Sequence, residues 1–248
     1  MDRLLELTSR AEQSHFWFRG FRAFIAPMVG QALAGVSAPQ ILDCGCGTGV
    51  NIELLRRYGH VRGFDLTHSG LLRARQLGRG PVVRASIGAI PFQDQCFDLV
   101  TCFDVLYALP DALERTAIRE LWRVLKPGGH ALLNVAALEL LRGSHSALSA
   151  ELRRYTTGSL RRSVEGGGFE VRRASYVFAS VFPITLAVRL AQRLRGGGDA
   201  QPGEFDITVP PAPINAALTA LVRAEAVALR AVNMPIGSSV LCLARKPA

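Results

Sequence analysis

Apolar residues along this chain fall into short runs and into longer segments with helical spacing. Between residues 40 and 137 the two patterns alternate five times, which predicts a parallel sheet with helices on both faces. Two later runs predict a sixth and a seventh strand. In chain order the runs are Ile41–Asp43, Gly59–Asp65, Ala85–Phe92, Cys96–Leu106, Ala131–Ala136, Phe169–Val177 and Gly237–Arg245.

The helical segments divide the chain into three parts. Residues 1–39 predict an N-terminal helical cover broken by Gly30, Gly35 and Pro39, and residues 40–177 with 237–248 predict the core. Residues 178–236 are longer than a hairpin connection needs, so we expect a helical insertion that forms a lid over an acceptor site. The helices are expected over Asn51–Tyr58, Glu120–Gly129, Thr157–Glu165, Phe182–Arg195 and Ile214–Val232, with Thr157 as an N-cap and Gly166–Gly168 as a stop.

The segment Ile41–Asn51 joins an apolar run, an acidic residue, three glycines at alternate positions and the start of a helix. Gly45, Gly47 and Gly49 lack a Cβ and can adopt positive φ, so a ligand can lie against the backbone. The dinucleotide fingerprint has the spacing G-x-G-x-x-G, whereas this loop reads Asp-x-Gly-x-Gly-x-Gly. Because the acidic residue would repel a pyrophosphate, the loop predicts a nucleotide ligand that carries an ammonium group.

The other segments follow in a fixed order. Asp65 ends the second run 16 residues after Gly49, near the distance at which an acidic residue binds ribose hydroxyls. Together with Ala85–Phe92, Cys96–Leu106 and Glu120–Gly129, these segments resemble the motifs of the class I S-adenosylmethionine-dependent methyltransferases. The resemblance implies a Rossmann-like α/β fold, in which a seven-stranded sheet is flanked by helices and is parallel except for an antiparallel strand pair at its edge.

The resemblance implies S-adenosyl-L-methionine as the cofactor and assigns residues to it. The glycines would cradle the cofactor, Asp43 would position its amino group, and Asp65 would bind the ribose. Trp17 and Arg19 would cover the methionine part, although packing between helices is an equal alternative. The predicted cofactor-binding set is Trp17, Arg19, Asp43, Gly45, Gly47, Gly49, Asp65, Leu66, Ser86, Ile87 and Phe103.

Acceptor chemistry is assigned to Asp104 at the end of the fourth run and to Tyr107 and Tyr155, and capping within the core is the alternative for Asp104. His15, His68 and His145 are further candidates for acceptor contact. The chain also resembles a bacterial small-molecule and envelope-type subfamily at His15–Arg22 and Arg153–Thr156. It departs from the family's pattern at Ser86, where Asp is usual, at Tyr107-Ala108, where Glu-His is frequent, and at Glu151, where His is frequent.

The charge and the cysteine content limit the binding partners and the cellular compartment that we expect. The 248-residue chain has a net charge of +9, but its arginines are scattered and not interleaved with aromatics, so we expect no nucleic-acid partner. Five cysteines without metal-ligand spacing predict reduced thiols, no metal and a cytoplasmic protein with no signal peptide. The longest apolar run, Tyr176–Val188, is too short to span a bilayer core of ~30 Å.

The sequence therefore predicts a methyltransferase that acts on a small or lipid-like acceptor. An apolar stripe at Leu218, Leu221, Val222, Leu229 and Val232, with Glu225 on it, predicts either helix packing or a peripheral contact at the inner face of a membrane. The alternatives are a non-catalytic S-adenosylmethionine-binding protein, a nicotinamide-dependent oxidoreductase and an RNA methyltransferase. The acceptor atom and the oligomeric state are left open.

Overall fold

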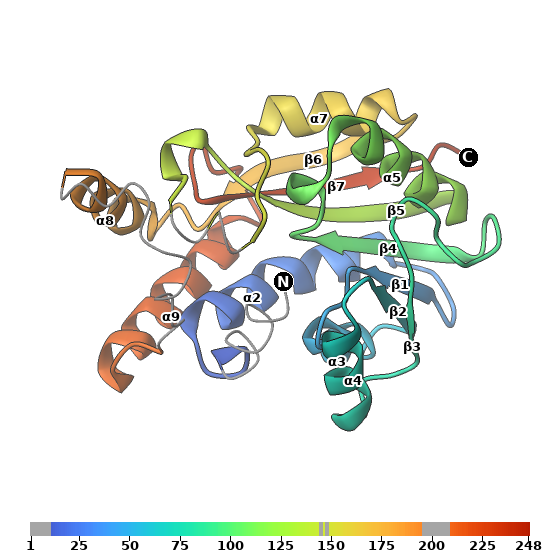
Figure 1. The fold of residues 1–248 in the computed structure, drawn as a ribbon, viewed down its shortest axis with the longest axis horizontal. Helices are drawn as coiled ribbons and strands as arrows, with labels where there is room; N and C mark the ends of the chain where they lie inside the picture. Colours follow the sequence, from blue (N-terminus) through green and yellow to red (C-terminus); the bar gives the residue numbers. More distant parts are fainter. Residues whose placement is uncertain (1–10, 144–145, 147–148, 195–208) are drawn as a thin grey trace.

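The computed structural model describes residues 11–143, 146, 149–194 and 209–248. Its strands are β1 (Gln40–Cys44), β2 (His60–Asp65), β3 (Val82–Arg84), β4 (Phe97–Phe103), β5 (Leu125–Ala136), β6 (Glu170–Val177) and β7 (Ser239–Arg245). They form one seven-stranded sheet in the order β3-β2-β1-β4-β5-β7-β6 (Figure 1). Strands β1 to β5 pair in parallel, and β7 pairs antiparallel with both β5 and β6. The predicted Rossmann-like α/β fold is thereby confirmed.

Helices cover both faces of this sheet, as Figure 1 shows. One face packs against α5 and α7, while α2, α3 and α4 pack against the other, with α9 lying on the outer side of α2. Alternate strand residues serve the two faces, so Leu42 belongs to the first core cluster and Ile41 to the second. The helices are α2 (Phe16–Ala32), α3 (Val50–Leu55), α4 (His68–Gln76), α5 (Asp111–Val124), α7 (Thr157–Gly166), α8 (Phe182–Leu194) and α9 (Ala212–Ala228), with 3-10 turns η1 (Leu106–Ala108) and η2 (Glu139–Leu141).

Several predicted boundaries were wrong. The helix predicted over Glu120–Gly129 ends at Val124, because the following residues, Pro127 included, already belong to β5. Helix α3 ends at Leu55 instead of Tyr58. The segment Ala85–Phe92 is irregular, and the third strand lies directly before it.

Two predicted helix signals also act differently from expectation. Thr156, not Thr157, caps α7, because its hydroxyl accepts from the Ser159 N–H and Ser159 reciprocates in a capping box. Gly30 does not interrupt the N-terminal cover, since α2 runs through both Pro27 and Gly30 to Ala32. The tertiary packing of the buried face of α2 outweighs these local helix breakers.

The N-terminal cover and the insertion are joined through α2 and α9. Asn215 of α9 accepts from the Phe16 N–H at 2.8 Å and donates to the Ser14 carbonyl at 2.9 Å. Glu225, predicted to form a buried pair or a ligand contact, instead accepts from the backbone N–H groups of Ala179 and Ser180 at 2.9 and 2.8 Å. Its carboxylate therefore fixes the chain just before α8. The three-part division itself stays a prediction.

Candidate functional site

The glycine loop between β1 and α3 has a backbone that side chains would obstruct. Gly45, Gly47 and Gly49 have φ values of 75°, 52° and 73°, in the left-handed region that favours glycine. A Cβ on Gly45 would lie 2.3 Å from Cγ2 of Val105. The Gly45 N–H donates to the Phe64 carbonyl at 2.8 Å, which ties the loop to β2. The loop therefore leaves a bare backbone at the carboxyl edge of the sheet, where ligands of open α/β sheets bind.

Asp43 lies at the end of β1 beneath this loop and is 2 % exposed. Its Oδ1 accepts from the Thr101 hydroxyl at 2.7 Å, whereas its Oδ2 is buried without a hydrogen-bond partner. Burial raises the pKa of Asp43 to about 6, with the Thr101 hydrogen bond lowering the pKa and the nearby Asp65 carboxylate raising it. A carboxylate held this way has a free acceptor for a cationic donor such as an ammonium group.

Asp65 stands at the end of β2, half-buried, and already has two backbone partners. Its carboxylate accepts from the Gly47 N–H at 2.8 Å and from the Thr67 N–H at 2.7 Å. The first bond fixes the glycine loop, and the second holds the turn that leads into α4. Leu66 beside it is 65 % exposed and so presents an apolar side chain at the same edge.

The residues predicted to lie beside the adenine and the transferred methyl group are also found at or after the ends of strands. Ser86 is exposed, and its hydroxyl accepts from the Gly88 N–H at 3.2 Å, while Ile87 is buried in the core. Phe103 ends β4 and packs edge-on against Phe21 of α2, with ring centroids 5.0 Å apart. These three residues thus lie after β3 and at the end of β4, along the same edge as the glycine loop.

The N-terminal segment is fastened to the glycine loop by a group that the sequence did not reveal. Glu12 accepts from the Thr48 hydroxyl at 2.6 Å and pairs with Arg79 at 3.5 Å, and both charged side chains are almost fully buried. Arg79 also pairs with Glu53 at 2.6 Å. Only the position of Thr48 between two loop glycines hints at this contact in the sequence, because Glu12 lies 36 residues away.

The predicted lid residues lie on the first turn of α2. Trp17 stacks on Phe178 with ring centroids 3.7 Å apart, and Arg19 is half-buried. His15 caps the helix by accepting from the Trp17 N–H, and burial lowers its pKa. His68 begins α4 in an exposed position, and His145 lies outside the described residues.

Asp104 follows β4 with φ 59°, a strained backbone for a residue other than glycine. Its carboxylate accepts from the Asn134 amide of β5 at 2.9 Å, and the Oδ1 of Asn134 is buried without a partner. Surrounding protein atoms raise the pKa of Asp104 to about 7, with Asn134 lowering the pKa and Glu151 raising it. The residue is exposed, so solvent moderates this rise in the pKa. Asn134, absent from the predicted set, sits in a strand and carries no motif.

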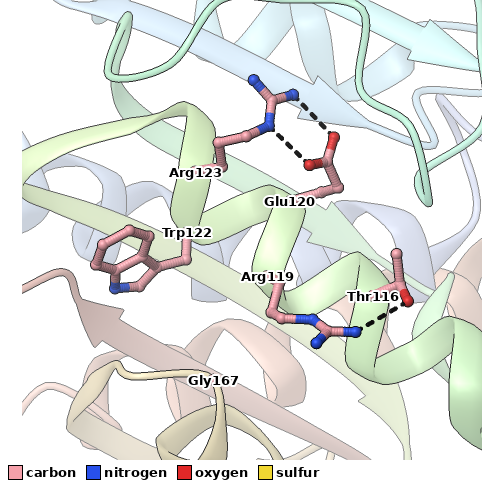
Figure 2. A pocket seen from close by; sticks show the side chains of 6 residues that line it. All are labelled: Thr116, Arg119, Glu120, Trp122, Arg123 and Gly167. Carbon is pink, nitrogen blue, oxygen red and sulfur yellow. Dashed lines mark hydrogen bonds and ion pairs between the residues drawn. The ribbon is translucent and has the colours of Figure 1, made fainter.

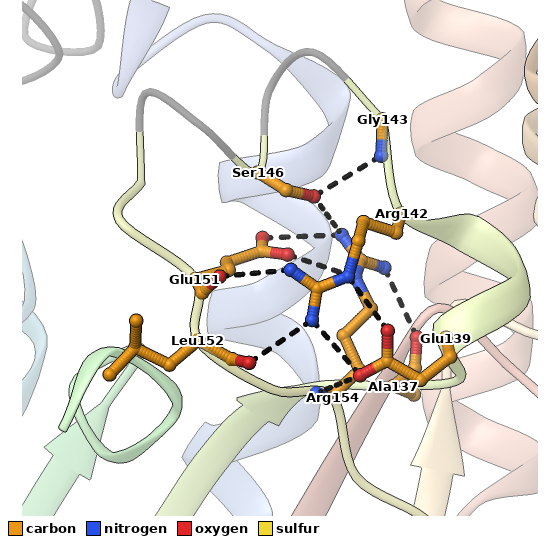
Figure 3. Close-up of polar contacts among 8 residues, drawn as sticks. All are labelled: Ala137, Glu139, Arg142, Gly143, Ser146, Glu151, Leu152 and Arg154. Atoms are coloured by element: carbon orange, nitrogen blue, oxygen red, sulfur yellow. Dashed lines mark hydrogen bonds and ion pairs between the residues drawn. The ribbon is translucent and has the colours of Figure 1, made fainter. Parts of the chain in front are cut away.

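Two arginines hold the segment that carries Glu151, the carboxylate that raises the pKa of Asp104 (Figure 3). Glu151 pairs with Arg154 at 2.9 Å in a nearly buried ion pair, so it fastens this segment. Arg142 pairs with Glu139 at 2.7 Å and also donates to the Glu151 carbonyl at 2.9 Å. Ion pairs and hydrogen bonds therefore hold the loop that carries Glu151.

The two predicted tyrosines lie beside this loop. The Tyr107 carbonyl accepts from the Leu152 N–H at 2.9 Å, and the phenol is buried, which raises its pKa. Tyr155 pairs its backbone with Ala137, and its hydroxyl is buried without a hydrogen-bond partner. Burial and the neighbouring Glu114 raise the pKa of Tyr155, so both phenols stay protonated near neutral pH.

An open groove of about 430 Å³ lies elsewhere, on α5 and the end of α7 (Figure 2). In this groove Arg123 forms ion pairs with Glu120 at 2.7 Å and with Asp94 at 2.6 Å, and Asp94 lies just before β4 begins. The groove is therefore near the amino ends of the strands, opposite the glycine loop. Within the described part of the chain no three His, Cys, Asp or Glu side chains gather as a metal site would require.

Comparison with known proteins finds similarity to methyltransferases. Residues 42–133 match a family described as a methyltransferase domain. The chain is 33% identical over 113 residues to a ubiquinone biosynthesis O-methyltransferase of Alkalilimnicola ehrlichii, covering 43% of this chain and 45% of that protein. It is 40% identical over 106 residues to a ubiquinone/menaquinone biosynthesis C-methyltransferase of Xylella fastidiosa, covering 38% and 41%. The chain thus spans less than half the length of these curated relatives.

Among solved structures, the cyclase SpnF superposes with a TM-score of 0.58 at 22% identity, covering 91% of this chain and 81% of that one. This likeness shows the fold alone. Because a protein named a cyclase shares the fold, the architecture by itself does not determine the reaction.

Proposed function

The chain belongs to the class I S-adenosylmethionine-dependent methyltransferase family, and on that premise we propose that it transfers a methyl group from S-adenosylmethionine to a small-molecule acceptor. The observation that carries the proposal is the buried, unpartnered Oδ2 of Asp43 beneath three glycines with positive φ. A buried carboxylate oxygen without a hydrogen-bond donor destabilises the fold, unless a bound ligand supplies the donor.

The residues at the strand ends fit this cofactor. Asp43 would accept a hydrogen bond from its ammonium group, and Asp65 would bind the ribose hydroxyls after exchanging a backbone partner. The bare backbone at Gly45 allows close approach of the ligand. When bound, the cofactor supplies an electrophilic methyl group. The chain's own residues then have to orient the acceptor and exclude water.

Asp104 is the group we assign to the acceptor. Its raised pKa suits a carboxylate that removes a proton from an acceptor hydroxyl near neutral pH. Asn134 holds one carboxylate oxygen at 2.9 Å and so fixes its direction. Tyr107 and Tyr155 would line the acceptor as protonated phenols, which can donate hydrogen bonds but cannot act as bases. The relatives named above include both an O- and a C-methyltransferase, so we leave the acceptor atom open.

Isothermal titration calorimetry with the purified chain tests the cofactor. S-adenosylmethionine or its demethylated product should bind, and NAD should not. Asp65→Ala should weaken binding by about 1.5 kcal/mol or more, roughly tenfold, through lost charge-assisted hydrogen bonds. Asp98→Ala, at the start of β4, is a matched carboxylate control outside the site. Tight NAD binding without S-adenosylmethionine binding would overturn the assignment.

Trp17 and Arg19 are proposed to cover the methionine part of the cofactor. Deleting residues 1–22 would also remove Phe21, which is buried in the core, so single substitutions are the better test. Arg19→Ala should weaken cofactor binding while leaving the melting temperature unchanged, whereas a packing role for Trp17 on Phe178 predicts that Trp17→Ala lowers stability. Unchanged affinity in the Arg19 variant would limit this turn to packing.

A non-catalytic S-adenosylmethionine-binding protein is the second candidate, favoured by the departures at Ser86 and Tyr107-Ala108 from the family's pattern. A panel of phenolic, carboxylic and polyprenyl acceptors separates the two, because only the enzyme releases demethylated cofactor. We propose that the productive acceptor is lipid-like.

A further inference from the structure

The insertion carries two helices whose apolar sides face outward. Among the α8 residues whose side chains are described, the exposed ones recur at helical spacing and are all Pro, Ala, Val, Ile or Leu, while Thr185 and Arg189 are less exposed. Among them Val188 is 49 % and Leu194 is 88 % exposed. A surface helix of a globular protein normally shows the opposite arrangement. The exposed set is Pro183, Ile184, Ala187, Val188, Leu190, Ala191 and Leu194.

Helix α9 repeats this inversion. Its polar residues Asn215, Thr219 and Glu225 are buried and bound to backbone groups of the protein. Every exposed residue of α9 except Arg223 is Ala, Pro, Ile, Leu or Val, and Val227 is 63 % exposed. The inward polar contacts fix the orientation of the helix, so the outward apolar face is built into the packing.

The charge around these faces is one-sided. Helix α8 contains no Asp or Glu, and the one acidic residue of α9 is Glu225, which is buried. The charged side chains described as exposed on α9 or just after it are both cationic, namely Arg223 and Arg230. An apolar face that is bordered by arginines, and on whose described residues no carboxylate is exposed, is complementary to an anionic lipid surface.

The location of α8 connects this surface with the acceptor end of the site. Helix α8 contacts η2, which directly follows β5 and its Asn134. Leu140 of η2 and Leu152 are exposed, and in Figure 3 Leu152 points away from the arginine cluster. Figure 1 shows α8 and α9 at the same end of the molecule. Among the described residues no helix is long and apolar enough to cross a bilayer, so contact would be along the surface.

We propose that the exposed residues of α8 and α9, which we name the apolar platform, rest on an anionic lipid surface. The lipid contact does not depend on the proposed function. Only its consequence, that the methyl acceptor is drawn from the bilayer, rests on that function. Exposed apolar faces of this extent mark an interaction surface, and the arginines favour lipid over a second, equally cationic copy of the chain.

Vesicle co-sedimentation with the full chain tests the platform without cofactor or turnover. Wild type should sediment with phosphatidylcholine vesicles that contain phosphatidylglycerol and less with pure phosphatidylcholine, and added salt should reduce binding. Val188→Asp with Val227→Asp should reduce the partition coefficient by about tenfold or more. Leu72→Asp, at an exposed apolar position on α4, is the matched control and should not change it.

A second pair of variants and a second measurement keep the test decisive. Arg223→Glu with Arg230→Glu should weaken binding to anionic vesicles only, and circular dichroism melting identifies variants that fail to fold. Absence of wild-type binding to anionic vesicles would refute the proposal. A wild-type dimer in sedimentation velocity that Val188→Asp converts to a monomer, without vesicle binding, would also refute it and assign the platform to self-association. Vesicle binding by a chain that fails to bind S-adenosylmethionine would refute the proposed function and leave the platform standing.

Discussion

The unpartnered oxygen of Asp43 predicts that the ligand-free protein is less stable at neutral pH than it could be. Asp43→Asn keeps an oxygen that can accept from Thr101 but removes the buried charge. Burial raises the pKa of the Asp43 carboxyl from 3.8 to about 6. The pKa values in the folded and unfolded states thus differ by about two, so the ionised carboxylate lowers the free energy of unfolding by about 3 kcal/mol.

The sign follows from the raised pKa. Below pH 3.8 the carboxyl is protonated in both states and costs nothing. Between pH 3.8 and about 6 it ionises only in the unfolded chain, so the stability of the fold falls until the full penalty is reached above about pH 6. We therefore expect Asp43→Asn to match wild type near pH 3.5, to exceed it by about half the full amount at pH 5, and to exceed it by about 3 kcal/mol above pH 7. Cofactor binding should weaken at the same time, because the ammonium group loses its counter-charge.

Urea unfolding of both ligand-free proteins across pH 4 to 8.5 measures the difference. Thr101→Val is a useful control, since it removes the one hydrogen bond that lowers the pKa of Asp43 and should widen the gap. A variant that is less stable than wild type at pH 8, or a stability difference that does not change with pH, would refute the reasoning.

Three further predictions concern the loop and the acceptor. Glu12→Gln should cost about 1–3 kcal/mol in chemical denaturation and weaken cofactor binding, because a buried arginine loses a counter-charge although Thr48 keeps an acceptor. Gly45→Ala should destabilise the fold by about 1–3 kcal/mol, and Val105→Ala should relieve the clash but not the strain of φ 75°. If Asp104 is the base, kcat/KM of wild type should rise with pH through a pKa above the ordinary carboxyl value, and the profile of Asp104→Asn should be flat.

The sequence predicted the parts of the site that depend on local geometry. The glycine loop and Asp65 follow strands, and the carboxyl ends of parallel strands meet at one edge, so spacing alone brings them together. The Glu12 contact with Thr48 joins residues 36 positions apart, and no local pattern encodes it. Asn134 looks like any strand residue until β4 is placed beside β5.

The insertion shows a different limit of prediction from sequence. Helical periodicity identified an apolar stripe on α9, and Val222 and Leu229 of that stripe are indeed buried. Leu221 and Val232 are exposed, however, because both sides of the helix are rich in apolar residues. The Glu225 carboxylate accepts hydrogen bonds from two backbone N–H groups, and these bonds fix which side of α9 is buried. The sequence does not reveal these partners, because they come from a different part of the chain.

The position of β7 has a consequence for biosynthesis. This strand is the last in chain order, yet it lies between β5 and β6 in the sheet. During translation, β5 and β6 therefore keep open edges until residues 239–245 have left the ribosome. Open strand edges invite aggregation and capture by chaperones. We expect ribosome-bound chains that stop before Ser239 to be protease-sensitive and chaperone-bound, and release of the β7 residues to close the sheet in one cooperative step.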